Sequence, residues 1–292
     1  MAKLVKNKLI QPFIKWAGGK RQLLGAINER LPQNFNNYYE PFIGGGAVLF
    51  DLQSENATIN DINKELINTY KTIRDFPVEL IEKLDELDEQ VKQDEKEFYY
   101  KARERYNVKL LANEHDIELA SLFIFLNKHC FNGLYRVNSK GLFNVPYNKS
   151  VASSYTRDNL LSVSEYLKGV KILTGDFEQA VANAKKGDFV FFDSPYAPLN
   201  DTSFESYTKE GFSKENHERL ARIFSELTDK GVYCMLTNHY TPFIEDLYKD
   251  FKSTSSVIEV KRFINSDANN RKGLEIIVWN YQLNNFMGQV GF

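Results

Sequence analysis

Cysteine and histidine are scarce in this sequence, which limits the sites it can build. The chain of 292 residues has two cysteines, Cys130 and Cys234, and neither belongs to a CxxC pair. A four-thiolate zinc site and a disulfide framework are therefore excluded. The four histidines are spread along the chain without H-x-x-x-H spacing, so we predict no metal and two reduced, packed thiols.

Long apolar runs are also missing. No segment is apolar over the roughly 20 residues that a membrane helix needs, and the amino terminus, MAKLVKNKLIQPF, lacks the apolar core and cleavage site of a secretory signal. Hydrophobic residues make up 42% and charged residues 26% of the chain, as in ordinary globular proteins. We expect a cytoplasmic protein without a membrane partner, built as one large domain or as a core with a smaller insertion.

Acidic residues are absent from two stretches, 1–28 and 119–157, although the formal net charge is only −2. The first stretch carries six Lys and Arg residues and the second carries five. The acids concentrate elsewhere, notably at 79–97, as on the solvated face of helices. The two basic stretches form either solvated surface or one face that binds phosphates, and composition leaves both interpretations open.

Strand and helix patterns alternate along most of the chain. Apolar runs bounded by glycine predict strands in ATIND, GVKILTGDF, GDFVFFDSPY and GVYCMLTN. Helical patterns cover 62–76, 78–128 and 214–228, and residues 255–281 predict two antiparallel edge strands. This order predicts an α/β fold with a mostly parallel, Rossmann-like sheet.

One segment breaks this pattern. Residues 130–156, CFNGLYRVNSKGLFNVPYNKSVASSYT, are rich in Asn, Ser, Gly, Tyr and Lys and show no long apolar period. We predict a loop-rich insertion between helix and strand. Irregular segments on a rigid scaffold are where recognition usually occurs.

The stretch NYYEPFIGGGAVLF predicts a strand, a tight glycine turn and a helix. Such a turn packs closely against nucleotide-like ligands, but Leu49 stands where the dinucleotide fingerprint needs its third glycine. The phosphate-loop pattern around GGKR fails as well, because Ile14 and Arg21 replace two of its required residues. Asp61, at the tip of the next strand, suits ribose hydroxyls. The expected ligand therefore carries a ribose and needs no phosphate site.

Four motifs, taken in order, resemble those of Dam-type DNA N6-adenine methyltransferases: PFIKWAGGK, EPFIGGGAV, GDF and DSPY. The insertion NKHCFNGLYRVNSKGLFNVPYN resembles the target-recognition region of that family, and the motif order is similar to its α group. The likeness runs from Pro12 to Tyr281. It implies an S-adenosylmethionine-dependent methyltransferase fold with a catalytic domain at 10–75 and 157–283 and a helical target-recognition domain at 76–156.

The resemblance implies a reaction and its catalytic residues. Asp193 and the carbonyl of Ser194 would accept the hydrogens of an exocyclic amine, which makes its nitrogen more nucleophilic toward a sulfonium methyl. Pro195 completes the tetrapeptide, and Tyr196 would stack on an adenine flipped out of duplex DNA. The implied enzyme is a site-specific, adenine-specific DNA methyltransferase that acts within GATC and releases S-adenosylhomocysteine.

The same resemblance assigns residues to the cofactor, S-adenosylmethionine. The set comprises Trp16 and Lys20 at the methionine end, Phe42, Gly44 and Gly46 along the turn, Asp61 at the ribose, Asp176 and Phe177 at the adenine, and Asp193 at both ligands. Without the motif, Trp16 would be interpreted as a core aromatic residue and Lys20 as a surface charge at a helix start.

Double-stranded DNA is the implied partner, bound by a monomer. Arg136 is expected to bond guanine O6 and N7, and Lys15 to reach the outer base pair. Further positions match residues that wedge into the stack or touch bases: Phe131, Asn132, Leu134, Asn138 and Pro146. An Asn-Gly hairpin turn with apolar flanks is the structural alternative for this segment.

Ser194 departs from the resemblance, because the family pattern usually has proline there. Serine restores an N–H and frees φ, so we hypothesise an active but slowed enzyme. Two alternatives stay open: an N4-cytosine DNA methyltransferase, and a sequence-specific DNA-binding protein that has lost catalysis.

Overall fold

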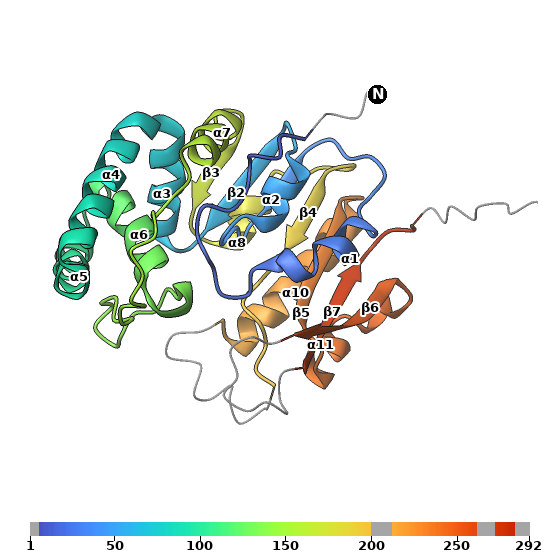
Figure 1. The fold of residues 1–292 in the computed structure, drawn as a ribbon. Helices are drawn as coiled ribbons and strands as arrows, with labels where there is room; N and C mark the ends of the chain where they lie inside the picture. The colour runs from blue at the N-terminus through green and yellow to red at the C-terminus, as the bar shows by residue number, and fades with distance from the viewer. Residues whose placement is uncertain (1–5, 200–211, 262–271, 284–292) are drawn as a thin grey trace, which may run out of the picture. The chain divides into compact units, whose positions relative to one another are not determined.

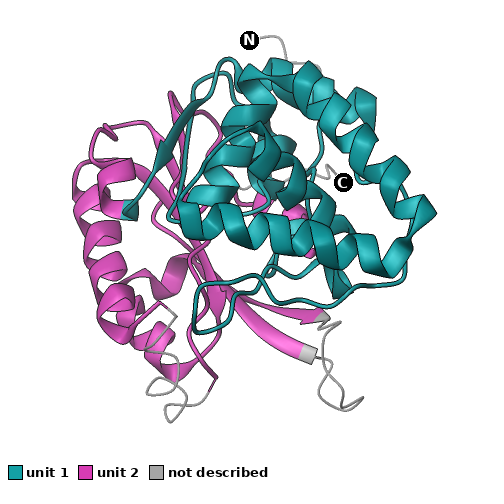
Figure 2. Ribbon diagram, turned by 90° about the vertical axis from the view of Figure 1, so that its left-hand side faces the viewer, with its two compact units in different colours: residues 1–21, 43–177 teal, residues 22–42, 178–292 magenta. Residues whose placement is uncertain are grey.

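The computed structural model describes residues 6–199, 212–261 and 272–283. The chain divides into two compact units, shown in two colours in Figure 2. Unit 1 comprises residues 1–21 and 43–177, and unit 2 comprises residues 22–42 and 178–292.

Unit 1 is built on two parallel strands, β2 (Ala57–Asp61) and β3 (Lys171–Thr174), with Asp61 opposite Thr174. Parallel strands need a long crossover, and helices supply it here (Figure 1). The crossover helices are α3 (Lys64–Asp75), α4 (Pro77–Gln93), α5 (Glu95–Ala112), α6 (Ile117–His129) and α7 (Arg157–Leu167). The short helix α2 (Ala47–Leu52) precedes β2.

Local sequence signals set the starts of these helices. The side chain of Asn63 accepts from Leu66 N at 2.7 Å, and that of Asp116 accepts from Leu119 N at 2.8 Å, so both residues are N-caps. Proline stands at the first position of α4, where its missing N–H does no harm. Helix α6 is buried almost all round, because α3, α4 and α5 all pack against it.

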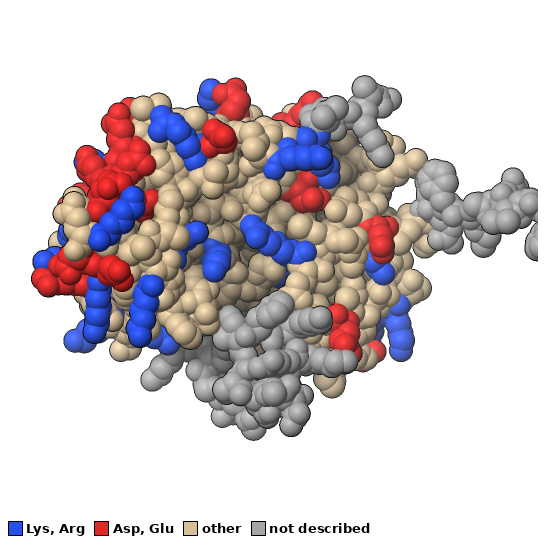
Figure 3. Space-filling model, viewed as in Figure 1, with Lys and Arg blue, Asp and Glu red and all other residues tan. Residues whose placement is uncertain are grey.

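Acidic side chains gather over α4 and α5, interspersed with lysine and arginine (Figure 3). Several are exposed and pair with lysine one turn away, as Glu89 does with Lys92 at 2.6 Å and Glu97 with Lys101 at 2.6 Å. The prediction of a solvated acidic helix face is therefore confirmed. Exposed pairs of this kind contribute little to stability.

Unit 2 has the strand order β1-β4-β5-β7-β6. The strands are β1 (Tyr38–Glu40), β4 (Phe189–Phe192), β5 (Tyr233–His239), β6 (Ser255–Lys261) and β7 (Lys272–Trp279). The first three strands in this order pair in parallel, and β7 pairs antiparallel with both β5 and β6. Every residue of β4 is buried, as expected for a central parallel strand.

Among the described residues, unit 2 contains the helices α1 (Leu24–Asn28), α10 (Lys214–Asp229) and α11 (Pro242–Leu247), while α8 (Phe177–Val181) starts at the last residue of unit 1. Three 3-10 turns complete the described part of the chain: η1 (Lys20–Gln22), η2 (Phe131–Gly133) and η3 (Lys249–Thr254). Helix α10 packs on β5. The predicted α/β class, with mostly parallel strands and an antiparallel edge pair, is confirmed.

The predicted loop-rich insertion is confirmed too. Between α6 and α7 the described structure holds η2 and two isolated antiparallel bridges, Cys130 with Tyr147 and Val137 with Phe143. The loop NSDANNRKG, predicted between the two edge strands, lies mostly outside the described residues.

Candidate active site

The glycine turn before α2 is closed by aromatic side chains. Gly44 has φ 46° and Gly46 has φ 71°, conformations that favour glycine. A Cβ on Gly44 would lie 2.7 Å from Cδ1 of Trp16, and one on Gly46 would lie 2.6 Å from the hydroxyl of Tyr70. That hydroxyl donates to Gly44 O at 3.0 Å. Because the turn carries no side chains of its own, the Trp16 ring and the Tyr70 hydroxyl pack directly on its backbone.

Asp61 ends β2 beside this turn. Its Oδ2 accepts from Gly44 N at 3.1 Å, and its Oδ1 accepts from Asn63 N at 3.0 Å. Burial raises the pKa of Asp61, although the backbone hydrogen bonds oppose that rise. The carboxylate is thus fixed by backbone on two sides, a geometry suited to accepting hydroxyl hydrogens.

Asp176 and Phe177 follow β3, the neighbour of β2. Gly175 N donates to Asp61 O at 3.1 Å, and its carbonyl accepts from Asn60 Nδ2 at 2.9 Å. The two strand ends are therefore tied together by their own backbone. Asp61 and Asp176 consequently lie at the carboxyl edge of one strand pair, where open α/β sheets bind ligands.

Trp16 lies against the glycine turn within unit 1, and Lys20 follows it in the same unit. The Trp16 ring stacks on Tyr135, with centroids 5.6 Å apart, and lies 6.2 Å from Phe123. Lys20 is 4% exposed, and its Nζ donates to Gly18 O at 2.5 Å. An ammonium is rarely buried without acceptors around it, so Lys20 is not the surface charge of the alternative interpretation. Phe42 differs from these residues, because it belongs to unit 2 and packs edge-on to Phe212.

The DSPY tetrapeptide leaves the buried strand β4 directly. Thr237 Oγ1 donates to Asp193 Oδ1 at 3.0 Å. Asn238 Nδ2 donates to Ser194 Oγ at 3.3 Å, and Asn238 Oδ1 accepts from Ala197 N at 2.9 Å. The end of β5 thus holds the tetrapeptide from the next strand.

Tyr196 is held at both its ring and its hydroxyl. The hydroxyl donates to Glu275 Oε2 at 2.6 Å, and the ring meets His239 edge-on with centroids 4.6 Å apart. Burial raises the pKa of Tyr196 strongly, and the charges of Asp193 and Glu275 add to the rise. Pro195, which precedes Tyr196 in the chain, is exposed.

The residues assigned to DNA all lie in unit 1. Phe131 is 53% exposed on η2, where Asn132 has φ 57°. Arg136 Nε donates to Asn144 Oδ1 at 2.9 Å, which fixes the guanidinium plane. A Cβ on Gly133 would lie 2.7 Å from Cβ of Lys15, so the amino-terminal motif and the insertion meet there.

Other residues assigned to DNA make hydrogen bonds that shape the insertion itself. Asn138 Oδ1 accepts from the backbone N of Lys140 and of Leu142, at 2.9 and 3.1 Å, and closes a turn. Pro146 O accepts from Phe131 N at 2.8 Å, while Leu134 follows η2 in extended conformation. The Asn-Gly pair of the structural alternative lies in η2, a 3-10 turn, rather than in a two-residue hairpin turn.

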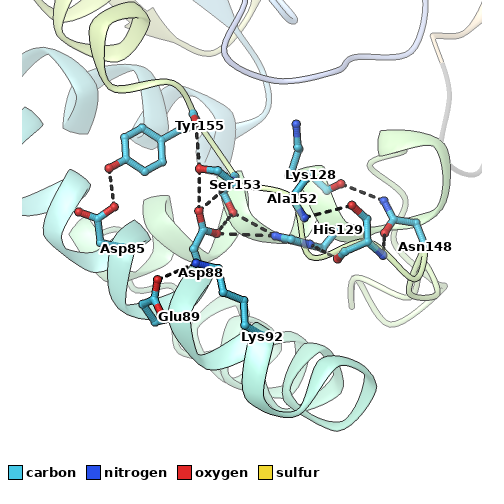
Figure 4. A network of polar contacts seen from close by, with 12 residues as sticks. Asp85, Asp88, Glu89, Lys92, Lys128, His129, Asn148, Ala152, Ser153 and Tyr155 are labelled. Atoms are coloured by element: carbon cyan, nitrogen blue, oxygen red, sulfur yellow. Dashed lines mark hydrogen bonds and ion pairs between the residues drawn. The ribbon is translucent and has the colours of Figure 1, made fainter.

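A buried polar network joins the two ends of the insertion to α4 (Figure 4). Asp88 Oδ1 accepts from Ser154 Oγ at 2.5 Å, and Oδ2 accepts from Ser153 Oγ at 2.9 Å. His129 Nε2 lies 3.2 Å from Ser154 Oγ, and its Nδ1 donates to Ser150 O at 2.8 Å. Since Asp88, His129 and Ser154 are all buried, this network fixes where the insertion leaves and re-enters the fold.

Several of these partners were not predicted from the sequence. A sequence pattern could have identified Thr237, Asn238 and His239. These polar residues end an apolar strand run, just as Asp193 follows the apolar run before it. No sequence pattern marks Glu275 or Asp88, since each belongs to an ordinary strand or helix pattern. Among the described residues, no group of three or more His, Cys, Asp or Glu side chains could hold a metal ion. In the described part of the chain, no helix is both long and apolar enough to cross a membrane.

Comparison with known proteins decides the family. The model of the D12 class N6 adenine-specific DNA methyltransferases matches residues 16–264. The chain belongs to this family. The Type II methyltransferase M1.LlaDCHI of Lactococcus lactis subsp. cremoris is 45% identical, over 95% of this chain and 98% of that protein. The Dam-type resemblance is thereby confirmed.

Other relatives of this D12 class protein agree over their full lengths. The Type II methyltransferase M.MjaIII of Methanocaldococcus jannaschii is 44% identical, over 93% of this chain and 99% of that protein. The DNA adenine methylase of Escherichia coli K12 is 30% identical, over 92% of this chain and 95% of that protein. A solved structure, the human methyltransferase 10 domain containing protein, covers 43% of this chain and 56% of that one, with a TM-score of 0.26 and 10% identity.

Proposed function

We propose that this D12 class protein transfers a methyl group from S-adenosylmethionine to N6 of an adenine flipped out of duplex DNA, within GATC. The observation that carries the proposal is the placement of Asp193. It directly follows a fully buried strand, and Thr237 holds one of its carboxylate oxygens at 3.0 Å. A carboxylate oriented before substrate arrives is what activation of a weak amine nucleophile requires.

Residues of unit 1 fit the methyl donor. When bound, the cofactor supplies the electrophilic methyl on its sulfonium. Asp61, fixed by two backbone N–H groups, would accept from the ribose hydroxyls, and buried Lys20 would pair with the methionine carboxylate. The Trp16 ring packs on the backbone of the turn at Gly44 and would form one wall of the cofactor site. Asp176 and Phe177 would hold the adenine of the cofactor.

Residues of unit 2 fit the target base. Asp193 and the carbonyl of Ser194 would accept the two amino hydrogens, so the nitrogen lone pair becomes available for attack. One proton leaves with the transfer and is taken up by the carboxylate of Asp193 or by water. Tyr196 would stack on the flipped adenine, which offsets part of the unstacking cost of about a few kcal/mol.

Recognition of the duplex is assigned to the insertion and Lys15. Arg136, held in plane by Asn144, would donate twice to a guanine of GATC. The exposed ring of Phe131, on a turn made rigid by Pro146 O, suits a wedge beside the flipped base. Lys15 lies against the same turn at Gly133. We propose that one monomer carries out the whole reaction.

The test is methyl transfer from labelled S-adenosylmethionine into three duplexes of equal length. One contains GATC, one has the adenine of GATC replaced on both strands, and one contains the shuffled site GTAC; the flanks of all three consist of G and C only. Label confined to the GATC duplex, and lost with Asp193→Ala, supports the proposal. Equal label in the GATC and GTAC duplexes supports adenine methylation but contradicts the assignment of GATC as the site. Label that survives replacement of the adenine points to cytosine, and no label in any duplex points to a DNA-binding protein without catalysis.

A further inference from the structure

Tyr196 is contacted by two residues, His239 and Glu275, that pair with each other across neighbouring strands. In the antiparallel pairing of β5 with β7, His239 stands directly opposite Glu275. Side chains of directly opposed residues share one face of the sheet. Both contact Tyr196: Glu275 Oε2 accepts from its hydroxyl at 2.6 Å, and the His239 ring meets its ring with centroids 4.6 Å apart.

His239 is itself oriented by the chain next to Tyr196. Its Nδ1 lies 2.8 Å from the carbonyl oxygen of Ala197. A carbonyl oxygen only accepts, so Nδ1 carries the hydrogen and the imidazole plane is fixed. The histidine therefore packs against the tyrosine ring at a steep angle, and Glu275 holds the tyrosine hydroxyl.

The bond to Glu275 has the character of a strong restraint. An O–H donor to a carboxylate at this length is charge-assisted and roughly twice as strong as a neutral hydrogen bond. Burial and the nearby carboxylates raise the pKa of Tyr196, so the phenol keeps its hydrogen and stays a donor at neutral pH. A ring held at both ends is oriented before a base arrives.

We propose that Glu275 is a positioning residue for the target base: through the hydroxyl of Tyr196 it holds the ring in the orientation on which the flipped adenine stacks. This inference rests on the proposed function. Glu275 touches neither the reacting nitrogen nor the methyl group in this assignment, so its effect passes entirely through Tyr196. The hydroxyl of Tyr196 then serves only to orient the ring and takes no part in the methyl transfer.

A double-mutant cycle on the full chain tests this. Single variants Glu275→Ala and Tyr196→Phe, and the double variant, are compared for kcat/KM toward the GATC duplex and for cofactor affinity by calorimetry. Each single change removes the same hydrogen bond, so each is expected to lower kcat/KM about tenfold. The double variant is expected to lose about tenfold as well, rather than about a hundredfold. Cofactor affinity is expected to stay unchanged.

Two further variants separate positioning from folding. Glu275→Gln keeps an acceptor oxygen and is expected to retain kcat/KM within about threefold. Glu218→Ala removes an exposed carboxylate from α10 of the same unit and serves as the charge-matched control, with unchanged activity. Thermal unfolding of every variant identifies any that fails to fold. If Glu275→Ala is one of them, the kcat/KM of Glu275→Gln is compared with that of Tyr196→Phe instead.

The outcomes are distinct. Losses that multiply in the double variant would overturn the inference, because Glu275 would then act independently of Tyr196. The same holds if Glu275→Ala and Glu275→Gln both match the wild type. If the wild-type protein itself transfers no methyl to any duplex, the proposed function fails and the inference falls with it.

Discussion

Asn238 Nδ2 donates to Ser194 Oγ at 3.3 Å, and both side chains are buried. Asn238 Oδ1 also accepts from the backbone N of Ala197 and of His239, each at 2.9 Å. One amide therefore ties the serine of the tetrapeptide, the residue after the tetrapeptide and the end of β5 together. A proline at 194 would restrain φ covalently, whereas this chain holds the side chain of Ser194, and the backbone of Ala197, by hydrogen bonding.

This relationship changes what we expect of Ser194→Pro. The sequence led to the hypothesis that serine slows the enzyme, but the hydrogen bond supplies a restraint in its place. We expect the turnover of Ser194→Pro to stay within about threefold of the wild type, the worth of one ordinary hydrogen bond. Single-turnover methyl transfer measures it, and a gain of tenfold or more would restore the slowing hypothesis.

Gly44→Ala tests the close packing of Trp16 on the glycine turn. The new Cβ would lie 2.7 Å from Cδ1 of Trp16 at a φ of 46°, so both strain and displacement of the indole are expected. We expect thermal unfolding to show a loss of about 1–3 kcal/mol and calorimetry to show weaker cofactor binding.

Gly25→Ala is the matched control for that change. It lies in α1, and a Cβ there would meet nothing within 4 Å. Alanine in a helix is favoured over glycine by about 0.5–1 kcal/mol, so this variant should be slightly stabilised and bind cofactor normally. Equal behaviour of the two variants would contradict a close-packed turn at Gly44.

Asp88→Asn tests the network that anchors the insertion. Burial raises the pKa of Asp88, but hydrogen bonds from His129, Ser154 and Ser153 outweigh it, and the net pKa is lowered. A lowered carboxyl pKa stabilises the fold above the unfolded value of about 3.9, and this contribution is lost as pH falls through the folded value.

We therefore expect Asp88→Asn to reduce the free energy of unfolding by roughly 1–3 kcal/mol at neutral pH. The difference from the wild type should shrink below about pH 4. Urea unfolding at several pH values measures it, with Glu82→Gln, an exposed carboxylate on the same helix, as a control that changes stability little. A difference independent of pH would mean that the charge of Asp88 is not what the network uses.

Arg136→Ala tests base reading. Loss of a bidentate contact costs about 1–3 kcal/mol of discrimination at one base pair. We expect the variant to methylate duplexes altered at the guanine of GATC nearly as well as GATC itself. Exposed Lys140, in the same insertion, provides the comparison, because Lys140→Ala should weaken all duplexes alike. Unchanged discrimination in Arg136→Ala would remove this residue from the recognition set.

Much of this protein follows from local pattern. Apolar runs and glycine boundaries placed β2, β3, β4 and β5, and the motif DSPY stood where β4 ends. These predictions succeeded because strand period, helix caps and turns depend on neighbours within a few residues. The loop-rich insertion was equally visible, since it has no period at all.

The partners that hold the site were decided only by tertiary structure. Ser194 meets Asn238 across 44 residues, Ser154 meets Asp88 across 66, and Tyr196 meets Glu275 across 79. Strand register and helix packing set these contacts, and a linear pattern does not encode either. The sequence alone thus determined which elements form and where the reactive motif lies, whereas the packing of distant segments decided which side chains orient it.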